Sequence, residues 1–136
     1  MIHTKKSITK LKKELDNIFS KYIRLKYSVD GYVNCFTCGV KKSWNQMQAG
    51  HFMSRKYIST RWQEDPPNVM PQCVSCNIFK SGMQYEYGKR LDALFGVGTA
   101  DEIQIKSREI VKLKKVDYIA MIEIYKLKVK KLIKEC

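Results

Sequence analysis

The 136-residue sequence lacks any run of 18 or more apolar residues, the length that a membrane-spanning helix needs. No apolar signal-peptide core follows the first residues, and neither internal repeats nor low-complexity stretches occur. A hydrophobic fraction of 44% excludes a wholly disordered chain. These features predict a soluble, cytoplasmic protein of one domain, residues 1–136, with no membrane as partner.

Acidic residues are also scarce relative to basic ones. Thirteen Asp and Glu stand against 26 Lys and Arg, which leaves a formal net charge of +13. The excess is +5 in residues 1–30, +4 in 31–100 and +4 in 101–136. Such a field favours polyanions, and nucleic acid above all, because neutralised phosphates release counterions. Lysine-rich helices that are only solvated would have a similar composition, so the charge predicts a nucleic-acid partner without predicting cleavage.

Cysteine provides the most specific pattern. Four of the five cysteines form two Cys-x-x-Cys pairs, Cys35–Cys38 and Cys73–Cys76, with 34 residues between them. Zn²⁺ prefers four such ligands, and two intervening residues let a tight turn aim both thiolates at one ion. Gly39 supplies the backbone freedom for the first turn. Disulfides are disfavoured without a secretory signal, and a redox dithiol needs no duplicate, so we expect a structural zinc ion.

Hydrophobic periodicity and turn residues divide the chain into three parts. Residues 1–30 should hold a basic helix over 7–27, residues 31–99 a zinc-stapled core, and residues 100–136 a basic helical arm. Within the core we expect strand in 31–48, a loop at 64–68 because consecutive prolines exclude helix and sheet, and a helix over 74–95.

Two capping residues and four aromatic residues add detail to this expectation. Thr99 and Asp117 should cap helices at about 100–108 and 117–134, respectively. Large aromatic side chains near the cysteine pairs are expected to pack around the zinc core rather than to stack on bases. They are Trp44, Phe52, Trp62 and Phe79.

The segment between the cysteine pairs carries the residues that suggest chemistry. His51 follows Cys38 by 13 residues, Asn68 lies further on, and Asn77 comes directly after the last cysteine of the second pair. This order resembles the HNH, or ββα-metal, endonuclease finger over about residues 33–82. The resemblance implies an α+β fold: a small zinc-stapled ββα-metal finger, here with helical N- and C-terminal arms.

A narrower resemblance extends over most of the chain. It rests on residues 20–24, the Cys35–Cys38 pair with Gly39, the run Ala49-Gly50-His51-Phe52, Arg61, Asn68 and the run from Gln72 to Gly82. These motifs look like the NinG/Rap family of phage recombination proteins, and the cysteine pairs with Asn77 are similar to endonuclease VII-type junction resolvases. The resemblance implies a phage or prophage endonuclease that acts on branched DNA such as Holliday junctions.

These residue types fit phosphodiester hydrolysis. A neutral imidazole can take a proton from water at physiological pH, so His51 is the expected general base. Mg²⁺ or Mn²⁺ would bind the scissile phosphate, and the family match implies Asn77 as its ligand. Asn68 is carried over as the residue that fixes the loop supporting His51. Phosphate contacts are expected from Arg55, Arg61 and Lys80, although the arginines could instead pair with acidic side chains.

One position departs from the common HNH pattern. Many HNH fingers carry a metal-binding aspartate directly before the histidine, whereas Gly50 stands there in this chain and in the NinG/Rap pattern. Candidates for a replacement ligand are Gln48, Glu64, Asp65 and Glu86, and a site completed by water and phosphate is the alternative. Asn77 could also simply cap the helix that it opens.

Two hypotheses of different class therefore remain. The first is a metal-dependent, structure-selective DNA endonuclease. The second is a non-catalytic, zinc-stabilised DNA-binding or junction-recognition module, which Gly50 favours. Paired cutting of a junction would require a homodimer, for which helices 7–27 and 117–134 are the expected pairing surfaces unless they pack against their own core.

Overall fold

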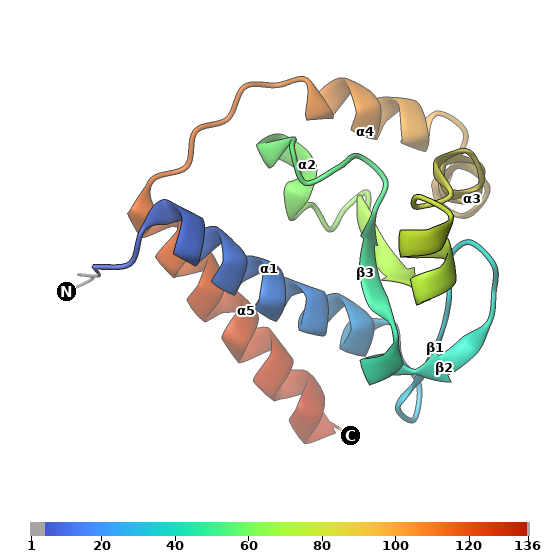
Figure 1. The fold of residues 1–136 in the computed structure, drawn as a ribbon, viewed down its shortest axis with the longest axis horizontal. Coiled ribbons are helices and arrows are strands. Elements are labelled where there is room, and N and C mark those ends of the chain that lie inside the picture. The colour runs from blue at the N-terminus through green and yellow to red at the C-terminus, as the bar shows by residue number, and fades with distance from the viewer. Residues whose placement is uncertain (1–4, 136) are drawn as a thin grey trace.

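A computed structural model of the chain describes residues 5–135 (Figure 1). The two long helices at the ends of the chain lie together on one side of a region that holds two short sheets (Figure 1). The elements in chain order are α1 (Ile8–Lys26), β1 (Tyr32–Asn34), β2 (Lys41–Ser43), η1 (Trp44–Gln46), β3 (Gln48–His51), α2 (Ile58–Arg61), β4 (Val69–Gln72), η2 (Ser75–Phe79), α3 (Gln84–Phe95), α4 (Thr99–Ser107) and α5 (Lys115–Glu135). The predicted mixture of α and β structure is confirmed. None of the helices within 5–135 has the length and apolar character of a membrane span.

Helix α1 begins where Ser7 accepts a hydrogen bond from the backbone N–H of Lys10. Its apolar residues recur at steps of three and four, so one face is buried. Helix α5 lies beside that face and runs in the same direction (Figure 1). The buried residues of the two helices are Leu11, Leu15, Phe19, Tyr22, Ile23, Leu25, Tyr118, Ile122, Tyr125 and Val129. The helix predicted over 7–27 is confirmed, and the two arms pack against each other within one chain.

The two sheets are both antiparallel pairs. Strand β1 pairs with β2, and this hairpin carries the first cysteine pair in its turn. Strand β3 pairs with β4 in a register that joins Gln48 to Gln72 and His51 to Val69. Because β4 leads directly into Cys73, this register places the histidine strand beside the second cysteine pair.

The prediction of one continuous helix over 74–95 is wrong, because the structure has two separate helical segments there. A π-helical turn, η2, ends at Phe79, and α3 begins only at Gln84. Between them Ser81, Gly82 and Met83 all have positive φ, of 54°, 87° and 54°. Left-handed backbone at successive residues cannot continue a right-handed helix, so the chain reverses there.

Both predicted caps are also corrected. Thr99 lies inside α4, and the helix is capped instead by the Asp92 carboxylate, which accepts from the Ala100 N–H at 2.9 Å. Helix α5 begins two residues before Asp117, whose carboxylate reaches back to the N–H of Lys114 at 2.8 Å. A carboxylate in the first turn can bond the donors that precede the helix, so the residue type was right but its position was not.

A substitution at Phe19 tests the packing between α1 and α5. Its ring is fully buried and meets the ring of Tyr125 edge-on at 4.9 Å. Phe19→Ala should lower the free energy of unfolding by about 3–5 kcal/mol, because it leaves a cavity in a packed core. Urea denaturation followed by circular dichroism measures this change. Leu127→Ala, at an exposed position of α5, is the control and should change it by less than about 0.5 kcal/mol. An equal loss of unfolding free energy in the two variants would contradict this packing.

Candidate active-site cleft beside a four-cysteine cluster

The four cysteines of the two pairs converge on one point. Their sulfur atoms all lie within 4.8 Å of one another, and the Sγ atoms of Cys38 and Cys73 are 3.7 Å apart. A tetrahedral zinc ion with bonds of about 2.3 Å separates its sulfurs by about 3.8 Å, whereas a disulfide needs about 2.05 Å. The four residues are free thiols in a geometry that fits a metal ion and is consistent with structural zinc.

Tight turns bring each pair together. Gly39 has φ of +81° and donates its N–H to the carbonyl of Cys35 at 3.0 Å, as its place after the first pair predicts. In the second pair the Asn77 N–H donates to the Cys73 carbonyl at 2.9 Å. Val33, Met47 and partly buried Trp44 pack around the sulfurs, so the metal site forms its own small core.

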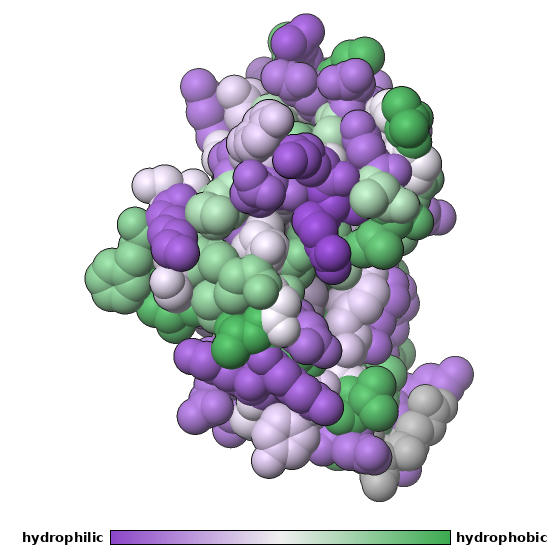
Figure 2. Space-filling model, turned by 90° about the vertical axis from the view of Figure 1, so that its right-hand side faces the viewer, coloured by the Kyte–Doolittle hydropathy of each residue, from purple (hydrophilic) through white to green (hydrophobic). Residues whose placement is uncertain are grey.

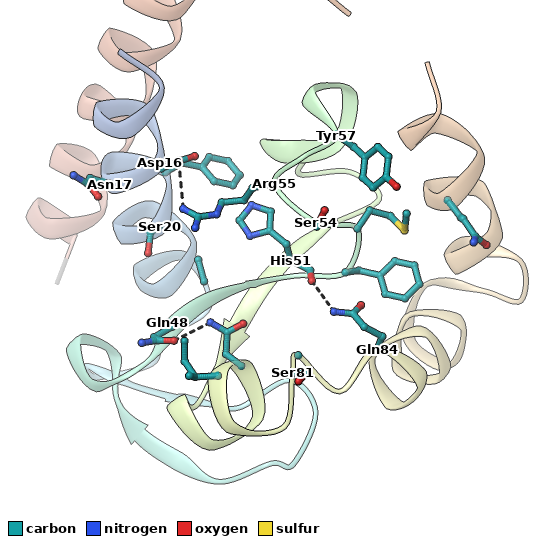
Figure 3. A pocket seen from close by; sticks show the side chains of 18 of the residues that line it. Asp16, Asn17, Ser20, Gln48, His51, Ser54, Arg55, Tyr57, Ser81 and Gln84 are labelled. Atoms are coloured by element: carbon teal, nitrogen blue, oxygen red, sulfur yellow. Dashed lines mark hydrogen bonds and ion pairs between the residues drawn. The ribbon is translucent and has the colours of Figure 1, made fainter. Parts of the chain in front are cut away.

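A cleft of about 1110 Å³ lies beside this cluster (Figure 3). Four parts of the fold line it: α1 on one side, β3 with the loop after it, the segment from η2 to the start of α3, and Gln104 of α4. His51 and Asn77 both line the cleft, so the fold brings together two of the three predicted catalytic residues. Asn68 is completely buried behind it.

The His51 ring has a defined tautomer. Its Nε2 lies 2.9 Å from the backbone carbonyl oxygen of Arg61, and a carbonyl only accepts, so Nε2 carries the proton and Nδ1 the lone pair. Burial lowers the pKa of His51 to about 4, and the bond to the Arg61 carbonyl opposes this shift only in part. The imidazole is therefore neutral at physiological pH.

Asn68 holds the loop between β3 and α2. Its side chain accepts from the Met53 N–H at 2.8 Å and donates to the carbonyls of Met53 at 3.0 Å and Thr60 at 2.9 Å. One buried amide therefore ties together both ends of the segment that leads to Arg61. Since the Arg61 carbonyl orients His51, Asn68 acts on the histidine through this loop.

The Arg61 side chain has a different role from the expected phosphate contact. Its guanidinium makes two bonds to Asp16 of α1, at 2.6 and 3.1 Å, and a third to the Arg55 carbonyl at 2.9 Å. Trp62 donates to the same carboxylate at 3.0 Å. An arginine engaged in this way, with a side chain only 15% exposed, is not available to grip DNA. The ion pair instead positions the backbone carbonyl that holds His51.

Asp16 is the residue of the candidate site that the sequence analysis missed. It lines the cleft from α1 and reaches Arg61 across 45 positions of sequence. Its only signal in the sequence is a lone carboxylate next to the buried stripe of a lysine-rich helix. Arg61 thus pairs with Asp16 rather than with Glu64 or Asp65, the acidic side chains nearest to it in the sequence. Glu64 instead accepts bonds from Tyr22 and Tyr125, both at 2.8 Å.

Asn77 bonds across the cleft to the histidine strand. Its Nδ2 donates to the side-chain oxygen of Gln48 on β3 at 2.8 Å (Figure 3), which leaves its own amide oxygen outside this bond. Val74 occupies the N-cap position of η2, so helix capping does not explain Asn77. Of the four candidate replacement ligands, Gln48 alone lines the cleft.

Gly50 has a steric explanation. A Cβ at this position would lie 1.8 Å from Oε1 of Gln72 and 2.5 Å from its Cδ. Gln72 is fully buried and donates to the Gly82 carbonyl at 2.9 Å and to the Thr37 hydroxyl at 3.1 Å. The Gln72 side chain therefore occupies the space that a side chain at position 50 would need, and a carboxylate there would require Gln72 to move.

The remaining predicted residues are divided between cleft and surface. Arg55 lines the cleft with a side chain that is 63% exposed and 3.6 Å from Asp16, which suits a phosphate contact (Figure 3). Lys80 is exposed but does not line the cleft. Among the four aromatic residues, only Trp44 packs against the cysteine cluster, because Trp62 lies in the α1–α5 core, Phe52 packs beside Tyr87, and Phe79 is in solvent.

The fold and the site together define a small α+β protein with a four-cysteine site that could hold a metal ion, next to an open cleft. The chain belongs to the family of the bacteriophage lambda NinG protein, whose model matches residues 2–135. No curated protein and no solved structure gives a significant match. The NinG part of the resemblance seen in the sequence is thus confirmed over almost the whole chain.

Metal content tests the cysteine cluster. The wild-type protein should carry one zinc ion per chain, and Cys73→Ser should lose it together with thermal stability, because three thiolates bind far more weakly than a closed set of four. Elemental analysis of purified protein measures the metal. Cys136→Ser, which changes the cysteine outside the cluster, should retain the full zinc content. Retention of zinc by Cys73→Ser would contradict this site.

The environment of His51 is testable by NMR titration. The ring should show the Nε2–H tautomer and titrate near pH 4, and His51→Gln should remove that signal. Since the folded pKa lies below the ordinary value of about 6.5, the stability contributed by the neutral ring is present above pH 6.5 and lost as pH falls towards 4. A His51 signal that titrates near 6.5 would show that the ring is not held as described.

Proposed function

We propose that this NinG-family protein is a metal-dependent endonuclease of the HNH type that cuts branched DNA, such as Holliday junctions, during phage recombination in the bacterial cytoplasm. The observation that carries the proposal is the state of His51. Its ring is neutral, Nδ1 carries no proton, and the ring lines an open cleft on a strongly basic protein. A general base for hydrolysis needs this combination of protonation state and access.

The order of elements around the cleft supports the HNH assignment. Strands β3 and β4 pair antiparallel and lead into η2, and this ββα order carries His51 on the first strand and Asn77 on the helical turn. The zinc-ligand pairs precede and follow the strands, as in zinc-stapled HNH fingers. Asn68 lies just before the second strand and bonds the intervening loop.

The proposed mechanism begins with proton transfer at His51. Nδ1 takes a proton from the attacking water, while Nε2–H continues to donate to the Arg61 carbonyl. The resulting imidazolium is stabilised by that carbonyl and by the negative charge of Asp16, which favours the protonated ring. Asn68 and the Asp16–Arg61 pair act as positioning residues, because they hold the loop that presents the carbonyl.

A divalent ion would be held on the other wall of the cleft. The Asn77 amide oxygen is a ligand type that Mg²⁺ and Mn²⁺ accept. Asp16, which also lines the cleft, is engaged by Arg61 and Trp62, so water and a DNA phosphate would complete the coordination. When bound, such an ion supplies charge neutralisation at the scissile phosphate and the leaving oxygen.

The charge distribution supports DNA as the partner. Arg55 inside the cleft and Lys80 near it are exposed cations on a chain of net charge +13. Symmetric cutting of a junction requires two active sites, so the proposal includes a homodimer, with α1 and α5 each already burying one face against the other. The pairing surface would then use their outward faces.

A non-catalytic junction-binding module is the second candidate function. The observation that favours it is the contact between Gly50 and Gln72, which leaves no space for the aspartate of the common HNH pattern. Zinc and positive charge serve this candidate equally well. Cleavage assays separate the two functions.

Cleavage of a labelled four-way junction and of a linear duplex with the same sequence, with Mg²⁺ or Mn²⁺, tests the proposal. Wild type should cut the junction, and His51→Ala should cut about 10²–10⁴ times more slowly, because it removes the general base. His3→Ala, which changes the other histidine, is the matched control. Zinc content and junction binding should be unchanged in both variants. Tight binding by wild type without cutting in either metal would leave only the binding module.

A further inference from the structure

Three exposed apolar residues lie on both sides of the turn at 81–83, and two of them, Ile78 and Tyr85, line the cleft. Phe79 at the end of η2 is 80% exposed, Tyr85 in the first turn of α3 is 75% exposed, and Ile78 is 55% exposed. We name these three residues the apolar rim. Nearby apolar positions such as Tyr87 and Leu91 are fully buried, so the core does not lack space for large side chains.

The apolar rim adjoins the candidate active site. Ile78 and Tyr85 line the same cleft as His51, and Phe79 follows Ile78 directly. Their position is determined by the chain reversal at residues 81–83, where the backbone has positive φ. A DNA strand whose phosphate lies at His51 would have its neighbouring nucleotides beside this rim.

The reversal is held rigidly against the cysteine cluster. The Gly82 N–H donates to the Cys76 carbonyl at 2.8 Å, and its carbonyl accepts from buried Gln72 at 2.9 Å. Gln84, at the start of α3, donates to the His51 carbonyl at 3.3 Å (Figure 3). Since these bonds join the rim to the metal site and to the histidine strand, the exposed rings stand on a fixed platform.

Positive charge surrounds the rim. Lys80 follows Phe79, and the Lys89 ammonium lies 5.0 Å from the centre of the Tyr85 ring. On the face drawn in Figure 2, hydrophobic side chains lie in several places among hydrophilic ones, including a group at the left edge. Exposed aromatic faces interleaved with lysines are the combination that binds unpaired nucleotides: the ring stacks on a base and the cation contacts its phosphate.

We propose that Phe79 and Tyr85 stack on unpaired or unstacked bases at the branch point of the DNA and so give the protein its preference for branched over linear DNA. The inference rests on the proposed function for its DNA partner. In a linear duplex every base is covered by its neighbours, so an aromatic ring finds no free base face. A branch point interrupts the stack and exposes such faces, which the rim can cover.

Binding measurements with the full-length, zinc-loaded protein test this proposal. The probes are a four-way junction carrying 2-aminopurine at the branch point and a linear duplex of matching sequence, both without divalent metal to prevent cutting. The variants are Phe79→Ala and Tyr85→Ala, with Tyr85→Trp as the variant that keeps a stacking ring. Val97→Ala, at a 98% exposed position that does not line the cleft, is the control.

Each alanine variant should bind the junction about 5- to 150-fold more weakly, as expected for the loss of one stacked base, and the duplex within about twofold of wild type. Tyr85→Trp and Val97→Ala should bind both probes like wild type. Wild type should quench the 2-aminopurine fluorescence, and the alanine variants should quench it less.

Other outcomes would overturn the proposal. Equal weakening on junction and duplex would mean that the rim only adds general affinity, and unchanged junction binding would mean that it touches no base. These results are independent of cutting. If wild type binds junctions selectively through the rim but cleaves nothing, the endonuclease proposal fails while base stacking stands. If wild type cleaves junctions but the rim variants bind them like wild type, base stacking fails while the endonuclease proposal stands.

Discussion

The convergence of four cysteine sulfurs within 4.8 Å is the constraint on which the rest of the site depends. It closes a loop of 34 residues that contains His51 and Asn68, and it sets the chain that follows on the course of η2. A domain of this size has a limited apolar core, so a metal held by two distant pairs can stabilise what packing alone would not. The end of β4, Asn77 and the turn at Gly82 all adjoin this closure, since β4 leads into Cys73, Asn77 follows Cys76 and the Gly82 N–H donates to the Cys76 carbonyl.

A second constraint, the ion pair between Asp16 and Arg61, connects the candidate site to helix α1. The Asp16–Arg61 pair is mostly buried and makes two short bonds, and breaking one partner of such a pair leaves a costly unpaired charge. Because the same arginine offers its carbonyl to His51, the packing of α1 is coupled to the orientation of the proposed base. Helix α5 supports α1 from its other side, so the two basic arms form part of the scaffold of the cleft.

The packing around Gly50 accounts for the absence of a carboxylate directly before His51. Gln72 fills the space beside Gly50, and its amide ties β4 to Thr37 and Gly82. The chain thus uses this position for packing between the two cysteine pairs. In the proposed endonuclease, the ligands left for a catalytic metal would be the Asn77 amide, water and DNA, so metal binding would depend on substrate more than in sites with a protein carboxylate.

The sequence by itself determined the two cysteine pairs and the long helices, because turns, helix periodicity and ligand spacing are set by residues close together in the chain. The grouping of His51, Asn68 and Asn77 came from the family resemblance and stays a prediction. Only the tertiary structure decided which distant side chains meet. Asp16 binds Arg61 from 45 positions away, Gln72 excludes a side chain at Gly50, and Phe79 points to solvent where packing was expected. Left-handed backbone at Ser81 and Met83 likewise broke a helix that periodicity predicted. Such outcomes depend on the register of β3 against β4 and on the docking of α1, and no local pattern contains them.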